Sequence, residues 1–390
     1  MNLFLNKILS CMPAQITPPQ RSDRGYSTAL QGPSKDCFVK SEASSPTFLG
    51  KSKGAKTKAG DCLKELDNIT CPYSGVKMIS GSKMDRLEVK LEHCNTIHER
   101  LDLLEKHKQC MQKLEKTMFN IFKGYAMNNP NGSLNECLQD MKPEALAMLR
   151  IEELKVLDAI DKISNKIEPK TALEVRRVTT NARKIILEDK QDQIFKRKDI
   201  LTSLYNITKD YPDQEIIAEM WQTANRLPKS TTNIDAFIVK YANRDPHEIA
   251  ARLLRPSVAS IEHITPKSIK PDHTLSNFML ASRDWNSDRS STPLPEYIDE
   301  HPNIPRNCQR YADDIIKSIH NGRLQDCQWY PYMLKEKLYD ESDGIIFISL
   351  SKYKVPEGEA FIDAPDDVVK KYNALKSKRE ARQTNTATNE

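Results

Sequence analysis

The sequence predicts an α+β protein that is predominantly α, with a multi-helix body and a small embedded strand–loop–strand–helix unit. The first observation is a helical periodicity, because apolar residues recur every three or four positions from residue 84 to residue 256. The second is residues 257–289, where two short apolar runs flank a turn-rich segment and a polar helical pattern follows. With 390 residues, of which 38% are hydrophobic and 29% charged, the chain is long enough for two or three domains.

Residues 1–60 come first, and we expect them to form a disordered basic tail. They are rich in Ser, Pro, Gly and Lys, and they hold nine Lys or Arg residues against three acidic ones. The rest of the chain balances 50 basic against 51 acidic side chains, although the whole chain has a formal net charge of +5. The body is therefore not a basic DNA-coating domain, and contact with nucleic acid must come from a local patch or from the tail.

The cysteines and the N-terminal residues bear on the compartment. None of the nine cysteines forms an intact Cys-x-x-Cys pair, which is typical of reduced thiols in the cytoplasm. The start, MNLFLNKILSCM, resembles an export signal only weakly, because Asn6 and Lys7 interrupt its apolar stretch. No apolar run approaches the roughly 18 to 20 residues of a membrane span. We therefore predict a cytoplasmic protein that contacts no membrane, with export as the alternative.

A segment of residues 61–82 leads into the predicted helical body, residues 83–256. Ser133 and Glu136 form a capping box at one helix start, and Pro169 suits the first turn of another helix. The apolar stripes between such breaks predict core packing, and the absence of a fixed-period repeat argues against a solenoid. A helical body of this kind could also bind a protein partner.

The chain beyond residue 292 is predicted to form a C-terminal cap, residues 293–364, and then a basic helix with a polar tail, residues 365–390. In the cap we expect three helices and one short buried strand that could close a small sheet. The helices are predicted around residues 296–300, 307–321 and 332–340, and the strand over residues 345–350.

Residues 257–292 carry the side chains that point to chemistry. The first strand closes on Glu262 and His263, which sets a carboxylate beside an imidazole. An imidazole suits the removal of a proton from water near neutral pH. A carboxylate together with an amide from the following helix supplies the oxygen ligands that Mg²⁺ prefers, with positions left for water and phosphate. This order of groups is therefore typical of a metal-dependent hydrolytic site.

At these residues the sequence resembles the HNH endonucleases, the ββα-metal nucleases. The matching residues are Glu262-His263-Ile264-Thr265-Pro266, then Ser276-Asn277, then Asn286-Ser287-Asp288-Arg289. The resemblance implies that His263 is the general base that activates water, and that Asn277 pins the loop and orients His263. It also implies that Glu262 and Asn286 ligate one divalent cation, and that Arg289 holds a phosphate.

The surroundings resemble, more loosely, a group of bacterial HNH proteins in which a long helical insertion separates two halves of a zinc ribbon. In those relatives each half carries a Cys-x-x-Cys knuckle. Here the first knuckle has Cys71 and Ser74, and the second has Ser282 and Trp285. Because a structural zinc needs four ligands and one thiolate remains, we expect no zinc. We expect Trp285 to fill part of that space by apolar packing.

The resulting expectation is an HNH-type metal-dependent endonuclease that hydrolyses phosphodiester bonds in DNA, with RNA as the alternative substrate. Its cofactor would be Mg²⁺ or Mn²⁺. Lys267 and Arg283 flank the motif and are candidates for phosphate binding, although exposed loop cations need no function. His273 in the loop is a reserve metal ligand. The alternative is a catalytically inactive helical interaction or nucleic-acid-binding protein that retains an HNH-like fold.

Overall fold

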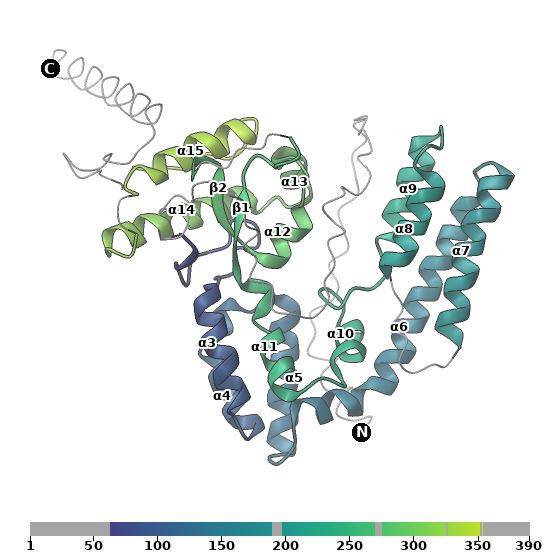
Figure 1. The fold of residues 1–390 in the computed structure, drawn as a ribbon, viewed down its shortest axis with the longest axis horizontal. Helices are drawn as coiled ribbons and strands as arrows, with labels where there is room; N and C mark the ends of the chain where they lie inside the picture. The colour runs from purple at the N-terminus through teal and green to yellow at the C-terminus, as the bar shows by residue number, and fades with distance from the viewer. Residues whose placement is uncertain (1–62, 189–196, 270–274, 325–326, 352, 354–390) are drawn as a thin grey trace, which may run out of the picture. The chain divides into compact units, whose positions relative to one another are not determined.

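The computed structural model describes residues 63–188, 197–269, 275–324, 327–351 and 353. In these residues the fold is α+β and mainly α, as the sequence predicts, with one two-stranded antiparallel sheet (Figure 1). None of the described helices has the length and the apolar content that crossing a membrane requires. The predicted tail of residues 1–60 and the predicted helix and tail of residues 365–390 lie outside the described residues.

The elements before the hairpin are mostly α-helices. They are α3 (Gly81–Glu92), α4 (Ile97–Glu105), η2 (Lys108–Cys110), α5 (Lys113–Asn128), α6 (Leu134–Ser164), α7 (Pro169–Leu187), α8 (Arg197–Thr208), α9 (Gln214–Ala224), α10 (Ile234–Tyr241), α11 (Pro246–Arg252) and η3 (Arg255–Ser257). The later elements are β1 (Ala259–His263), η4 (Leu275–Asn277), β2 (Phe278–Ser282), α12 (Arg283–Arg289), α13 (Leu294–Glu300), α14 (Ile304–His320) and α15 (Tyr330–Glu341). The last three are the helices predicted for the C-terminal cap.

Two predicted helix starts are confirmed in detail. α6 begins after Ser133, whose Oγ accepts a hydrogen bond from the Glu136 N–H at 3.4 Å. Glu136 Oε2 in turn accepts the Ser133 N–H at 2.9 Å, which completes the capping box. α7 begins with Pro169, at a position where no helical N–H bond is lost. Local sequence signals therefore determine where these two helices begin.

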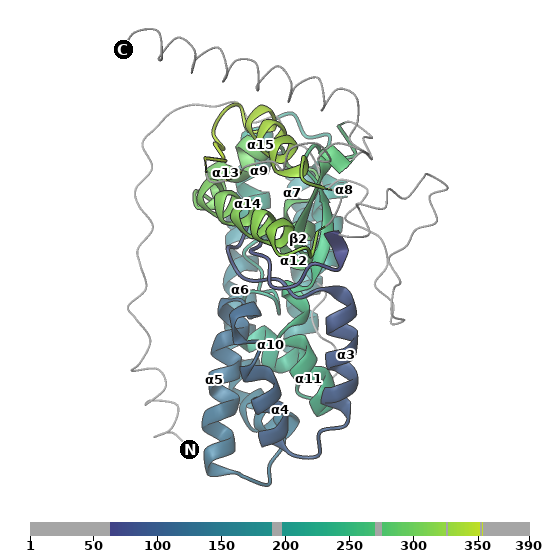
Figure 2. The same cartoon turned by 90° about the vertical axis from the view of Figure 1, so that its left-hand side faces the viewer.

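Buried apolar side chains gather into three clusters, and the long helix α6 contributes to two of them. One cluster joins α3, α4, α5, α10 and α11 to the first part of α6 (Figure 2). A second joins the later part of α6 to α7, α8 and α9. The third joins residues 63–78 to both strands and to α13, α14 and α15. The hairpin is therefore packed between the segment that precedes the helical body and the C-terminal helices.

Residues 345–350 correct one prediction, because they form no strand. Their burial alternates as in a strand, since Ile348 is fully buried whereas Phe347 is 66% exposed. At Ser349 both backbone groups bond to a side chain on α14. Gln309 accepts the Ser349 N–H at 2.7 Å and donates to the Ser349 carbonyl at 3.2 Å. Alternating burial therefore does not require a neighbouring strand.

A buried carboxyl on α6 gives the fold a pH dependence. Glu153 is 6% exposed, and burial raises the pKa of its carboxyl from 4.5 to about 7, although nearby Arg150 opposes the rise. Between these pH values the folded chain keeps a proton that the unfolded chain releases, so the free energy of unfolding falls as the pH rises. We expect Glu153→Gln to raise the free energy of unfolding by about 3 kcal/mol at pH 8 and to change it little at pH 4.

Urea denaturation of wild type and Glu153→Gln at the two pH values measures this difference. Glu144→Gln, at an exposed position of the same helix, is the control. It should leave the free energy of unfolding within about 0.5 kcal/mol of wild type at both pH values. An equal effect of Glu153→Gln at pH 4 and pH 8 would contradict the prediction.

Candidate hydrolytic site

β1 and β2 form an antiparallel hairpin that α12 follows directly, so the predicted order of strand, loop, strand and helix is confirmed (Figure 1). Across the hairpin His263 pairs with Phe278. β1 is also joined to the segment before α3, since the N–H of Ala259 donates to the Ile79 carbonyl at 2.9 Å. The first residue of β1 is thus bound to a segment from a distant part of the chain, and its last residue is paired with β2.

Asn277 holds the loop between the strands, at the end of η4. Its side chain is fully buried, its Oδ1 accepts the Thr265 N–H at 2.7 Å, and its Nδ2 donates to the Thr265 carbonyl at 3.1 Å. Its own carbonyl accepts the N–H of Ile264 at 2.9 Å. These three bonds fix the backbone immediately after His263, which is the arrangement that the resemblance implies for a loop-pinning residue.

His263 is the last residue of β1, and it is half-buried. Its ring lies edge-on to the Phe278 ring, with a centroid separation of 4.8 Å and an interplanar angle of 83°. Its backbone carbonyl accepts a hydrogen bond from Arg289 Nη1 at 3.0 Å. The backbone that carries the imidazole is therefore fixed, while part of the residue remains in contact with solvent, as a general base for water requires.

Glu262 faces the interior. It is 4% exposed, and its Oε1 accepts hydrogen bonds from the Tyr73 hydroxyl at 2.9 Å and from Arg289 Nη1 at 2.5 Å. Burial raises the pKa of this carboxyl, and the charge of Arg289 opposes that rise. Glu262 is therefore one half of a buried ion pair, and its carboxylate is not presented to solvent.

Arg289 is the other half of this ion pair, and the side chain is 0% exposed. Its Nη1 also donates to the Tyr73 hydroxyl at 2.8 Å. Its remaining hydrogen bonds, at 2.8 to 3.2 Å, go to the backbone carbonyls of His263, Ile264 and Thr292. A phosphate in solvent cannot reach a guanidinium enclosed in this way. The arrangement therefore gives Arg289 partners within the chain in place of the phosphate that the resemblance implies.

Asn286 lies on α12 against β1 and is half-buried. Its Nδ2 donates to the Ser260 Oγ and to the Ile261 carbonyl, both at 3.0 Å. The two predicted metal ligands, Glu262 and Asn286, thus have different partners. Asn286 is hydrogen-bonded to β1, whereas Glu262 is paired with Arg289. Within the described ranges, no group of three or more His, Cys, Asp or Glu side chains is placed to hold a metal ion.

The two segments that resemble zinc knuckles meet, although 211 residues separate Cys71 from Ser282. The Sγ of Cys71 lies 3.3 Å from the Ser282 Oγ and accepts the Ser282 N–H at 3.4 Å. Ser74 turns to its own loop, where its Oγ accepts the Val76 N–H at 3.2 Å. In the bacterial HNH proteins that the chain loosely resembles, the corresponding segments are the two halves of one zinc ribbon, so this contact agrees with that resemblance.

Trp285, the fourth knuckle position, packs partly buried against the cluster that contains Cys71. Its indole Nε1 donates to Gln112 Oε1 at 2.9 Å. Its ring makes edge-on contacts with the His301 ring and the Tyr297 ring, at centroid separations of 4.9 and 6.4 Å respectively. The indole therefore joins α12 to α13 and to the residue that precedes α5.

The two flanking cations are exposed. Lys267 lies in the loop after β1, and Arg283 is the first residue of α12. Both side chains can therefore meet a ligand in solvent, and both remain candidates for phosphate contact. His273, the reserve ligand, lies outside the described residues.

Sequence reasoning missed Tyr73, which is 2% exposed and contacts both halves of the ion pair. Burial raises the pKa of its hydroxyl well above the ordinary value, so the group is a neutral donor to Glu262 and acceptor for Arg289. The available signal was its place between the knuckle positions Cys71 and Ser74. An aromatic residue at such a position is ordinary core packing unless a buried charge is known to lie beside it.

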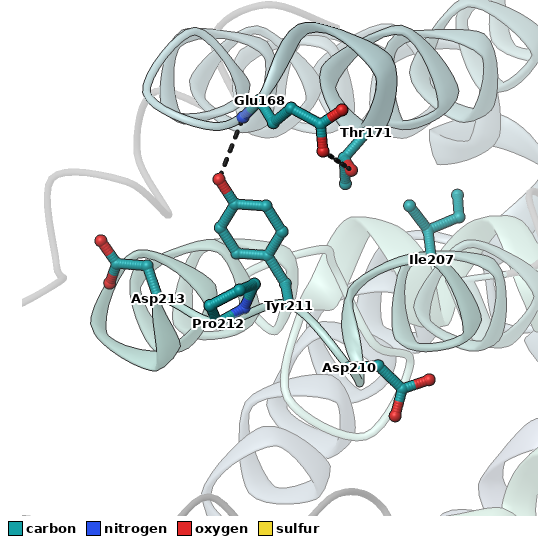
Figure 3. Close-up of a pocket in the computed structure, with 7 residues that line it drawn as sticks. All are labelled: Glu168, Thr171, Ile207, Asp210, Tyr211, Pro212 and Asp213. Atoms are coloured by element: carbon teal, nitrogen blue, oxygen red, sulfur yellow. Dashed lines mark hydrogen bonds between the residues drawn. The ribbon is translucent and has the colours of Figure 1, made fainter.

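A separate hollow of about 400 Å³ lies between α7 and the turn that joins α8 to α9 (Figure 3). It is lined by Glu168, Thr171, Ile207, Asp210, Tyr211, Pro212 and Asp213. The Tyr211 hydroxyl accepts the Glu168 N–H at 3.0 Å. None of the predicted site residues lines this hollow, and its three carboxylates would repel a phosphate.

Comparison with known proteins adds no family to this description. No protein-family model, curated protein or solved structure matches the chain. A function must therefore be inferred from the geometry and chemistry of the hairpin.

Proposed function

We propose that the chain is an HNH-type endonuclease that hydrolyses phosphodiester bonds in DNA. The observation that carries this proposal is the hairpin, in which Asn277 pins the loop, His263 ends β1 half-buried, and Asn286 reaches from α12 to β1. The contact between Cys71 and Ser282 supports it, because it joins the segments that a helical insertion separates in the group that the chain resembles. The choice of DNA over RNA follows from the resemblance.

His263 starts the reaction. Its imidazole takes a proton from water, the water oxygen attacks the phosphorus, and the bond from phosphorus to the 3′ oxygen breaks. The 3′ oxygen leaves with the electron pair of that bond and takes up a proton from solvent. Asn277 fixes the backbone beside His263, so the imidazole keeps one position relative to the bond. Lys267 and Arg283 are exposed near the hairpin and neutralise charge on flanking phosphates.

The resemblance also implies a divalent cation, Mg²⁺ or Mn²⁺, which in enzymes of this kind stabilises negative charge on the phosphate and the leaving oxygen. Asn286 offers its Oδ1, since both of its hydrogen bonds to β1 come from Nδ2. Glu262 does not fit a cation in this arrangement, because its carboxylate is buried and already paired with the Arg289 guanidinium. Proton transfer by His263 requires no ligand role for Glu262.

A second function is favoured by the same buried ion pair. In this case the chain is a catalytically inactive protein whose helical body binds a protein partner or nucleic acid. Glu262 then stabilises the fold by neutralising Arg289, and the hairpin is a structural relic of a nuclease. The degraded knuckles and the weak charge of the body also fit this function.

Plasmid nicking by the purified full chain, with Mg²⁺ or Mn²⁺, tests the first function. We expect His263→Ala to lower the nicking rate by at least about 100-fold, because a general base contributes on the order of 10² to 10⁴. His98→Ala, at an exposed position of α4, is the matched control and should nick like wild type. Nicking that persists unchanged in His263→Ala would remove His263 from the mechanism. No nicking of DNA or RNA with either metal would favour the inactive protein.

A further inference from the structure

We infer that Arg289 is the resident cation of the site: its guanidinium supplies to Glu262 the positive charge that a divalent cation would otherwise bring. Glu262 is then a structural counter-ion and not a metal ligand. The inference concerns the same hairpin as the proposed function, but it does not depend on proton transfer by His263.

The Arg289 guanidinium and the Tyr73 hydroxyl occupy the positions beside Glu262 Oε1 that a cation would need. The nitrogens of Arg289 donate to Glu262 Oε1, to the Tyr73 hydroxyl and to three backbone carbonyls, at 2.5 to 3.2 Å. All three guanidinium nitrogens therefore have acceptors: Nη1 lies within hydrogen-bond distance of three, and Nε and Nη2 each donate to one carbonyl. A cation that approached Glu262 would displace the guanidinium and leave buried acceptors without a donor, which is unfavourable.

The charge balance of the network points the same way. Tyr73 is a neutral hydroxyl, and one carboxylate and one guanidinium cancel. Both charged side chains are buried, with exposed fractions of 5% and 0%. A divalent cation placed here in addition to Arg289 would leave an excess of positive charge in a site that excludes water.

The carbonyls that Arg289 binds show which segments its side chain connects. The carbonyl of His263 is at the end of β1 and that of Ile264 directly follows the strand, whereas that of Thr292 follows α12. Arg289 thus ties the end of the first strand to the end of the helix. It is a positioning residue for the His263 backbone, and Glu262 balances its charge.

Mn²⁺ titration of the full chain, followed by electron paramagnetic resonance of free Mn²⁺, tests the inference in four proteins. These are wild type, Glu262→Gln, Arg289→Met and the double variant. We expect wild type and Glu262→Gln to bind Mn²⁺ with affinities within about twofold of each other. We expect Arg289→Met to bind Mn²⁺ at least about tenfold more tightly than wild type, and the double variant to lose that gain, because Glu262 is then free to act as a ligand.

Two results would overturn the inference. One is wild type binding Mn²⁺ at least about tenfold more tightly than Glu262→Gln. The other is an Arg289→Met variant that is folded, as judged by circular dichroism, and binds Mn²⁺ no more tightly than wild type does. Should Arg289→Met fail to fold, wild type is compared with the double variant: equal affinity supports the inference, and a tenfold weaker double variant overturns it. Because Mn²⁺ affinity is measured without substrate, a failure to nick DNA bears on the proposed function alone.

Discussion

Replacing Arg252 by methionine is expected to lower the free energy of unfolding by about 3–5 kcal/mol, because a buried carboxylate loses its partner. Arg252 on α11 is 6% exposed and Glu115 on α5 is 1% exposed, and their Nη1 and Oε1 atoms lie 2.8 Å apart. Arg252 Nε also donates to the Tyr241 hydroxyl at 3.1 Å, and the guanidinium lies 5.5 Å from the Phe237 ring centroid. One side chain thus joins α5, α10 and α11.

Urea denaturation followed by circular dichroism measures this loss. Arg255→Met is the matched control, because Arg255 pairs with Glu88 at the same 2.8 Å but the two side chains are 42% and 34% exposed. We expect the control to lose less than about 1 kcal/mol. A double variant, Glu115→Met with Arg252→Met, should recover part of the loss, because no buried charge remains. Equal losses in Arg252→Met and Arg255→Met would show that burial adds nothing to this ion pair.

The order of the hairpin elements could be predicted because each has a local signal. The loop was predicted from turn residues between two apolar runs, and the pinning role of Asn277 came from the resemblance. The structure gives Asn277 two hydrogen bonds with the Thr265 backbone. The strand predicted over residues 345–350 was wrong because alternating burial does not identify the hydrogen-bond partner of the backbone, which at Ser349 is the Gln309 side chain.

The partner of Glu262 could not be predicted from the sequence. Neighbouring residues on a strand point to opposite faces, so Glu262 and His263 cannot both turn toward one side. The dipeptide alone does not say which of the two faces the core. The structure turns Glu262 inward, where Arg289 lies 27 positions later in the chain, and leaves His263 half-buried. Deciding between the two faces requires the packing of residues 63–78 on the hairpin, which no local pattern encodes.

Arg289→Met is expected to lower the free energy of unfolding by at least about 3–5 kcal/mol. The substitution leaves Glu262 buried without a counter-ion and removes the donor for three backbone carbonyls. Denaturant unfolding followed by tryptophan fluorescence reports the change, because Trp285 and Trp329 both pack in the cluster around the hairpin. Arg310→Met, at an exposed position of α14, is the control and should stay within about 0.5 kcal/mol of wild type.

A double-mutant cycle with Glu262→Gln then isolates the interaction between the two charges. We expect the double variant to lose less than the sum of the single losses by at least about 1 kcal/mol, because each single variant leaves one buried charge unpaired and the double variant leaves none. Strictly additive losses would mean that Glu262 is not balanced by Arg289 in the folded chain. A carboxylate without an internal counter-ion would be available to a divalent cation, whereas strong coupling would mean that the charge of this hairpin is balanced before any metal arrives.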